Sequence, residues 1–372
     1  MEEKGTIGIP KALMFYRFFP FWQAFFEKLG WKVVVSGGVG KKGKIVYFED
    51  SCLPMKLIVT HSVSLKDKVD HLFIPRLVSL HRSYIMCPKF RGAPDIVRLA
   101  TEGKVSILDE TIDLRESSYL RTFLRIGKTL GASEKETKQA FSKAQKFSLT
   151  FQKEWAGRIN RVPSKQLFQL EIPTPPQKNK LQEISPPLGF ESQRLVPALR
   201  PGKTGTTEDG GGDKGEGDNL LRVALIGHPY NLFDIDINKD ILTLMKSLGM
   251  EIVTSDSLPE KEVDRHLSDL SKEIYWSSGR EIVGALFHFL SGDADGVIFL
   301  TSFKCGIDAL LQEFIKRTLK VRGGSCAPFL ILSFDEHTGR EGMTTRLEAF
   351  RDVMDEKKKS QMSKLKVQIN DK

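Results

Sequence analysis

Three of the four cysteines have a sequence context that suits metal ligation. Cys52, Cys87 and Cys305 each lie between an expected β-strand and an expected α-helix, and the first two of these helices are expected to start near Pro54 and Ala93. A thiolate at a helix N-terminus meets the positive end of the helix dipole and free backbone N–H groups, which lower the pKa of the thiol. The same N–H groups can donate hydrogen bonds to the sulfur atoms of an iron–sulfur cluster. These three cysteines are therefore candidates for one shared metal site.

The spacing of the cysteines along the chain leaves a second interpretation of these residues open. The chain contains no CxxC motif, so the site would have to be assembled by folding. Free cysteine is also among the most frequently buried residue types, and the three thiols could simply pack in the core. Cys326 precedes an expected strand, so we assign it to the core, although a role as a fourth ligand stays open.

Basic residues accompany the cysteines. Arg82 and Lys89 flank Cys87, and Lys304 directly precedes Cys305. Their positive charge would offset an anionic cluster or a CoA phosphate. Charged loop residues are also commonly just solvated, so cofactor binding by these three side chains is one of two interpretations.

Candidate acid–base groups follow two other expected strands. His228, in the segment Gly-His-Pro-Tyr-Asn, could donate a proton or a hydrogen bond to a substrate or a cluster sulfur. Glu336 and His337, in Asp-Glu-His-Thr-Gly, could act as acid–base groups. Structural roles are equally open: His228 satisfied by backbone at a tight turn, and the second segment capping the following helix.

The elements that must position these residues alternate between strand and helix patterns. Short apolar runs are separated by segments with helical spacing, which indicates mostly parallel sheets covered on both faces. The fold class we predict is α/β, with two doubly wound, mostly parallel domains. The expected strands are Thr6–Ile9, Trp31–Ser36, Lys44–Phe48 and His71–Ile74, then Leu221–Ile226, Glu251–Thr254, Gly296–Leu300 and Pro328–Leu332.

Composition divides the chain into five segments. We expect an N-terminal α/β domain at 1–133, a helical segment at 134–160 and a flexible linker at 161–219. The linker assignment rests on eight prolines followed by a run rich in glycine and charged residues, which buries too little to offset its ordering entropy. A C-terminal α/β domain at 220–355 and a basic tail at 356–372 complete the prediction.

Charge and hydropathy narrow the class of protein. The formal net charge of the 372 residues is +9, but the last 17 residues carry six lysines against two acids. Elsewhere acids and bases are interspersed without an aromatic-rich basic patch, so we do not expect a nucleic-acid partner. The apolar stretch at 12–26 is interrupted and too short to span a bilayer, so we expect no membrane association and a cytoplasmic location.

Several separated motifs, in the same order, resemble a known family. They are Ile7–Leu13, Phe18–Phe26, the three cysteine segments, Gly227–Asn231, Asp335–Gly339 and Thr345–Phe350. Together they are similar to the domain of poorly defined function found with acyl-CoA dehydratase activases, in the 2-hydroxyacyl-CoA dehydratase family of iron–sulfur proteins. The resemblance covers residues 5–155 and 220–355 and omits the expected linker and tail.

The resemblance implies a cofactor and a chemistry. In similar dehydratase subunits three cysteines hold a 4Fe–4S cluster with one open position, and an ATP-hydrolysing activase supplies a low-potential electron that forms a ketyl radical from the 2-hydroxyacyl thioester. By this resemblance Cys52, Cys87 and Cys305 would be the cluster ligands. An ATP-dependent activase would be the partner, an acyl-CoA a possible substrate and a dimer a possible assembly.

The resemblance is closer to the activase-associated domain than to a dehydratase subunit. The role therefore stays open between a dehydratase-like enzyme, an electron carrier, a maturation partner and a non-dehydrating reductase. The alternative, from a different functional class, is a non-catalytic partner that docks an activase or a dehydratase subunit.

Overall fold

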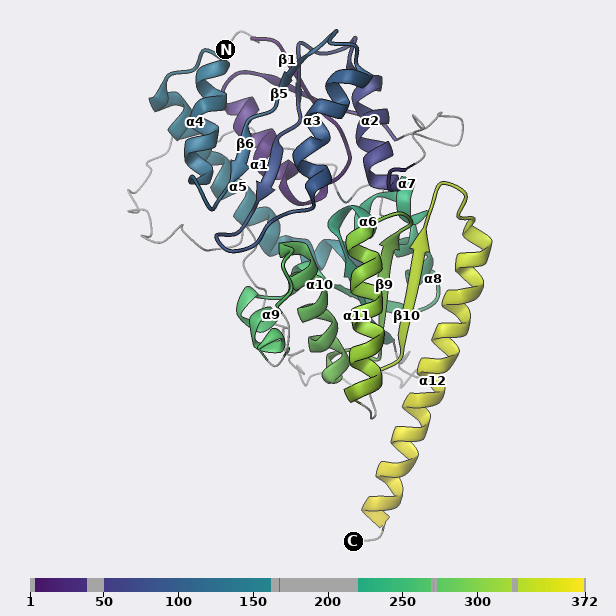
Figure 1. Cartoon of the computed structure of the whole chain (residues 1–372). Helices are drawn as coiled ribbons and strands as arrows, with labels where there is room; N and C mark the ends of the chain where they lie inside the picture. Colours follow the sequence, from purple (N-terminus) through teal and green to yellow (C-terminus); the bar gives the residue numbers. More distant parts are fainter. Residues whose placement is uncertain are drawn as a thin grey trace, which may run out of the picture.

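The computed structural model describes residues 4–38, 50–161, 167, 220–268, 270, 273–322 and 327–370. They form two halves, each built on a four-stranded parallel sheet flanked by helices (Figure 1). The predicted α/β class with mostly parallel sheets is confirmed. The expected strand Lys44–Phe48, nearly all of the expected linker and Cys326 lie outside the described residues.

The N-terminal sheet has the strand order β2-β1-β3-β5. Its strands are β1 (Thr6–Ile9), β2 (Lys32–Val35), β3 (His71–Phe73) and β5 (Ser106–Leu108). Two further strands, β4 (Arg76–Ser79) and β6 (Thr111–Asp113), form a separate parallel pair. The helices of this half are α1 (Phe15–Lys28), α2 (Leu53–Leu65), α3 (Pro88–Ala100), α4 (Tyr119–Thr129) and the long α5 (Glu134–Arg161).

An aromatic cluster fills the core between α1, α4 and α5. Phe21 packs against Phe123 and Phe141 with ring centroids 5.0 and 5.2 Å apart, and Phe25 packs against Phe123 at 4.7 Å. The rings meet edge to face, the arrangement that their quadrupoles favour. The aromatic run of α1 is therefore a core-packing face, which holds α5 against the N-terminal half.

The C-terminal sheet has the order β10-β9-β7-β8. Its strands are β7 (Leu221–Gly227), β8 (Met250–Thr254), β9 (Gly296–Ser302) and β10 (Phe329–Phe334). The chain leaves β7 toward β8 on one side and returns to β9 on the other, so the order reverses between β7 and β9. Open parallel sheets bind ligands at the carboxyl ends of the strands at such a switch point.

The remaining elements of the C-terminal half cover this sheet and extend beyond it. They are α6 (Pro229–Phe233), α7 (Ile235–Asn238), α8 (Ile241–Ser247), the short helix η2 (Ser255–Ser257), α9 (Glu260–Leu267), α10 (Ser277–His288), the π-helical turn η3 (Phe289–Asp293), α11 (Gly306–Arg322) and α12 (Arg340–Asn370). Helix α12 includes most of the expected basic tail and projects away from the body in Figure 1. None of the described helices is long and apolar enough to cross a membrane.

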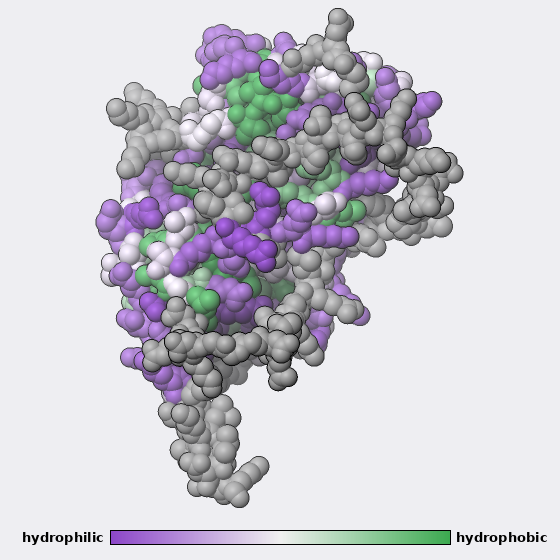
Figure 2. All heavy atoms as spheres, turned by 180° about the vertical axis from the view of Figure 1, so that it is seen from behind, coloured by the Kyte–Doolittle hydropathy of each residue, from purple (hydrophilic) through white to green (hydrophobic). Residues whose placement is uncertain are grey.

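Polar contacts join the two halves. Arg17 of α1 forms an ion pair with Glu281 of α10 at 2.9 Å. The amide of Asn160 in α5 donates to the Ile252 carbonyl of β8 at 2.9 Å and accepts from the Ile252 N–H at 3.0 Å. Figure 2 shows the reverse face, where hydrophilic side chains of both halves are interspersed with separate hydrophobic patches. These contacts hold α1 and α5 of the N-terminal half against α10 and β8 of the C-terminal half.

Two boundaries differ from expectation. Helix α3 begins at Pro88 rather than near Ala93, because proline is well suited to the first position of a helix, where no intrahelical N–H bond is needed. In addition, β4 intervenes between β3 and Cys87, so Cys87 does not directly follow a strand of the main sheet. It follows a loop that is tied back by the Met86 N–H, which donates to the Val78 carbonyl at 2.9 Å.

Candidate metal and catalytic centre

Each of the three predicted cysteine ligands lies at a helix N-terminus. Cys52 is the N-cap of α2 and Cys87 the N-cap of α3, and each helix has a proline in its first two positions. Cys305 directly precedes α11, and its carbonyl accepts from the Ala309 N–H at 3.0 Å. The shared helix-start context predicted from the sequence is confirmed for all three residues.

The two halves bring the three thiols together. Burial raises the pKa of Cys305, and the nearby Asp308, Cys52 and Cys87 raise it further. Burial likewise raises the pKa of Cys87, and Cys52 adds to the increase. Cys52 and Cys305 are only 7% and 8% exposed, while Cys87 is half-buried. Since like charges shift one another's pKa only over short distances, the thiols share one largely buried site.

Burial outweighs the helix termini in setting these pKa values. The backbone N–H groups of Met55, Lys89 and Asp308, each in a first helical turn, lower the pKa of Cys52, Cys87 and Cys305 respectively. The net direction is nevertheless upward at all three thiols, which corrects the expectation from the helix dipole alone. Buried thiols of this kind release their protons when a metal cation binds and stabilises the thiolates.

The chemistry of the donors is the basis for considering an iron–sulfur cluster. Cysteine thiolates are the ligands that hold such clusters in proteins, so three cysteines at one largely buried site are a donor set that fits an iron–sulfur cluster.

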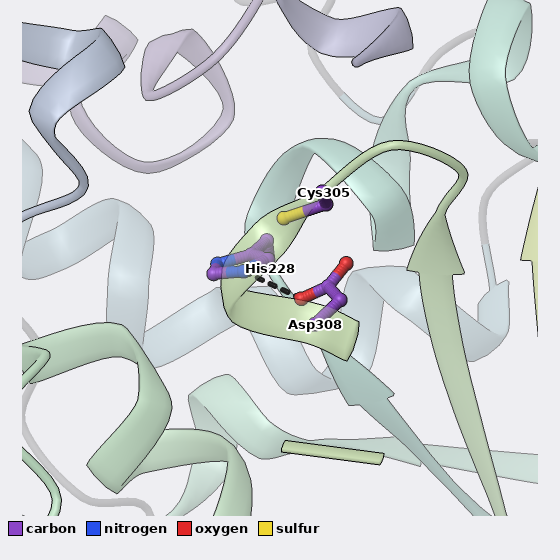
Figure 3. A group of neighbouring side chains, drawn as sticks. All are labelled: His228, Cys305 and Asp308. Atoms are coloured by element: carbon purple, nitrogen blue, oxygen red, sulfur yellow. Dashed lines mark ion pairs between the residues drawn. The ribbon is translucent and has the colours of Figure 1, made fainter. Parts of the chain in front are cut away.

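His228 and Asp308 form a buried pair beside Cys305 (Figure 3). His228 follows β7 as the N-cap of α6, and Asp308 lies in the first turn of α11. His228 Nε2 lies 2.9 Å from Asp308 Oδ1, although neither atom has a well-aligned hydrogen bond among the described residues. The Tyr230 ring stacks on the His228 ring with centroids 4.9 Å apart. Two polar atoms are thus held without a good hydrogen bond next to a thiol.

A hydrogen-bond network fixes Asp308 at the β7–β9 switch point. Its Oδ2 atom accepts from the Ser302 N–H at 3.1 Å and from the Asn231 side-chain amide at 3.4 Å. The Ser302 hydroxyl donates to Asn231 Oδ1 at 2.6 Å. Because all of these residues are buried, the carboxylate has one fixed orientation and can act on His228 and Cys305.

The predicted basic residues divide into two groups. Lys89 lies at the site, because its charge lowers the pKa of both Cys52 and Cys87. Lys304 and Arg82 are exposed. Lys89 is therefore placed to compensate negative charge at the thiols.

Glu336 and His337 lie in the loop after β10. Glu336 Oε1 accepts from Lys56 Nζ at 2.6 Å, and Lys56 lies one turn beyond Cys52 in α2. His337 is exposed, and its backbone N–H donates to Asp335 Oδ1 at 3.0 Å. Glu336 therefore contacts the helix that carries Cys52, whereas the backbone of His337 belongs to a turn closed by Asp335.

Three site residues were missed as individual candidates by sequence reasoning. Asp308 follows Cys305 by three residues, which places it one turn further along α11. Tyr230 follows His228 by two residues, and Lys56 follows Cys52 by four. A polar residue three or four positions after a helix-start cysteine is the signal that could have found Asp308 and Lys56, since residues at that spacing lie on one helix face.

Comparison with protein families supports the resemblance. The family described as "CoA enzyme activase uncharacterised domain" matches residues 6–258, more than half of the chain. The matched range includes Cys52, Cys87 and His228, while Cys305 lies beyond it. A comparison with curated proteins finds none that matches. The extent of the family match shows that this chain belongs to the CoA enzyme activase uncharacterised domain family.

Proposed function

We propose that this protein binds a 4Fe–4S cluster through Cys52, Cys87 and Cys305. The observation that carries the proposal is the meeting of three helix-start thiols, two from one half and one from the other, in a single largely buried site. Three protein ligands would leave one iron without a cysteine. The family relationship supports an activase as the partner that delivers electrons, and an acyl-CoA as the compound that is reduced or dehydrated.

The cluster, when bound, would supply low-potential one-electron chemistry. The protein's own residues would tune that site. Lys89 would offset the negative charge, and the first-turn N–H groups of the three helices would donate to sulfur. His228, oriented by Tyr230 and Asp308, would donate a proton or a hydrogen bond to a bound thioester. Burial of the thiols would exclude water and oxygen from the reduced site.

The direct test measures iron, acid-labile sulfide and the visible spectrum of protein purified and reconstituted without oxygen. We expect about four irons per chain in the wild type. Cys52→Ser, Cys87→Ser and Cys305→Ser should each lose most of the iron, while Cys326→Ser, the matched control, should retain it. Addition of an activase with ATP and a reductant should then bleach the visible absorbance of the wild type.

A colourless wild-type protein that resists reconstitution would overturn the proposal. A variant that lacks Cys52, Cys87 and Cys305 could then be tested for binding to an activase. If it bound as tightly as the wild type does, the cysteines would be structural and the protein would be a docking partner.

A further inference from the structure

A second group of metal-ligating side chains lies on the opposite end of the C-terminal half. Glu262 and His266 of α9 and His288 at the end of α10 place one ligand atom each within 4.8 Å of one another. His288 precedes the amino end of β9, whereas Cys305 follows its carboxyl end. Since β9 has seven residues, the two groups are separated by about 20 Å of strand.

Helix packing brings the three side chains together. Glu262 and His266 are four residues apart on α9 and therefore share one helix face. Helix α10 approaches this face at Gly284, where an added Cβ would lie 2.6 Å from the Val263 side chain and 2.9 Å from its carbonyl. Arg280 of α10 further fixes the pair through an ion pair with Asp264 at 2.9 Å. Figure 1 shows α9 beside α10. The close contact at Gly284, one turn before His288, allows the His288 ring to reach His266.

The separation of the two imidazole nitrogens matches joint ligation of one ion. His266 Nε2 and His288 Nδ1 lie 3.3 Å apart, with the ring planes at 81°. Two nitrogens bound to a tetrahedral zinc ion, at about 2.0–2.1 Å each, are about 3.3 Å apart. Hydrogen bonds between N–H groups and their acceptors are commonly shorter, with a mode of about 2.9–3.0 Å for oxygen acceptors.

The Asp293 carboxylate favours the tautomer of His288 that metal ligation requires. His288 Nε2 lies 2.9 Å from Asp293 Oδ2, at the end of the π-helical turn η3. If Nε2 carries the proton and donates it to Asp293, then Nδ1 presents its lone pair toward His266 and Glu262. Histidine ligands of metals commonly donate their second N–H to such a carboxylate, which also raises their basicity.

We propose that Glu262, His266 and His288 form a binding site for a zinc-type divalent transition-metal ion, with Asp293 as the outer carboxylate. Two histidines and a glutamate are a donor set found in zinc sites, and with three protein ligands the fourth position is left to water. The ion would link α9 to α10. This proposal is independent of the iron–sulfur site, because the two groups of residues lie at opposite ends of the sheet.

The test uses the untagged full chain, with zinc binding measured by equilibrium dialysis and the site examined with Co²⁺. The double variant His266→Gln/His288→Gln should bind about one equivalent less than the wild type. Co²⁺ bound to cysteine gives a thiolate-to-cobalt charge-transfer band, whereas Co²⁺ bound to histidine and glutamate does not. The Co²⁺ that the double variant fails to bind should therefore leave the intensity of this band unchanged. His337→Gln, which alters an exposed histidine elsewhere, should bind the wild-type amount.

The variant Asp293→Asn distinguishes metal ligation by the two histidines from a hydrogen bond between them. It should weaken Zn²⁺ binding about 10–100-fold without removing a ligand. Zn²⁺ should also raise the unfolding temperature of the wild type more than that of the double variant. Far-UV circular dichroism of the metal-free variants establishes that they fold. Equal metal content and affinity in the wild type and the folded double variant would overturn the proposal and leave the two histidines as a hydrogen-bonded pair.

Discussion

Lys56 Nζ lies 2.6 Å from Glu336 Oε1, so that an ion pair joins α2 of the N-terminal half to the loop after β10. The Lys56 side chain is only 2% exposed and that of Glu336 20%. A buried ammonium that loses its carboxylate partner keeps its desolvation penalty. The pair therefore holds the Cys52 helix against the C-terminal half.

Neutralising Glu336 alone should destabilise the protein. We expect Glu336→Gln to lower the free energy of unfolding by about 3 kcal/mol, because the buried Lys56 ammonium would lose the carboxylate that lies 2.6 Å away. Lys56→Met/Glu336→Gln should be more stable than Glu336→Gln, since the double variant removes the charge as well. Urea unfolding of the two single variants and the double variant measures the coupling. Strictly additive losses would show that the contact is not an energetic pair.

The local signals of the cysteine sites could be read from the sequence, but their assembly could not. Pro54 and Pro88 mark the starts of α2 and α3, and the second was missed because the helix was expected to begin near Ala93. The meeting of Cys87 with Cys305 depends on how the two halves pack. That packing rests on long-range contacts such as Arg17 with Glu281, which no periodicity within a segment predicts.

Buried polar residues were the least predictable part of the site. Lysine is almost never fully buried unless it is paired, so nothing local indicated that Lys56 lies inside. The partner of His228 is Asp308, which lies in another helix and is brought close only by the pairing of β7 with β9. Residue type and helix position thus predicted the candidate ligands, while tertiary structure determined their charge environment.

Two buried side chains, Asp234 and His61, should give opposite dependences of stability on pH. Burial raises the pKa of Asp234 to about 7 and lowers that of His61 to about 4. Between about pH 4 and 7, folded Asp234 keeps a proton that the unfolded chain releases, so its contribution to stability falls as pH rises. Between about pH 4 and 6.5, folded His61 lacks a proton that the unfolded chain binds, so its contribution rises.

Single variants should expose these two slopes. Relative to the wild type, Asp234→Asn should make the free energy of unfolding increase with pH between 4.5 and 6.5, by about 1.4 kcal/mol per unit. His61→Gln should shift it by a similar amount in the opposite direction. Urea unfolding at several pH values measures both differences. Parallel profiles for all three proteins would show that neither group titrates abnormally.

Lys89 should control the acidity of two thiols in the metal-free protein. Its charge lowers the pKa of Cys52 and Cys87, so Lys89→Met should raise both pKa values. At a fixed pH below those values, alkylation of the two thiols should slow, because the thiolate is the reactive form. Lys89→Arg should restore the rate. Lys316→Met, which removes an exposed charge about three turns along α11 from Cys305, is the control and should alkylate at the wild-type rate.

Gly227 should be indispensable where β7 ends and His228 begins. It has φ +157°, and an added Cβ would lie 2.7 Å from the Leu300 carbonyl oxygen of β9. Gly227→Ala therefore forces β7 and β9 apart or distorts the turn, and we expect a loss of about 1–3 kcal/mol in the free energy of unfolding. Gly306→Ala is the matched control, because an added Cβ meets nothing within 4 Å although the residue adjoins Cys305. A shift of β9 at Leu300 should also move the loop that carries Cys305, so Gly227→Ala should lose reconstituted iron while Gly306→Ala keeps it. Equal stability and iron content in the two variants would mean that the close approach of Gly227 in β7 to Leu300 in β9 does not position the site.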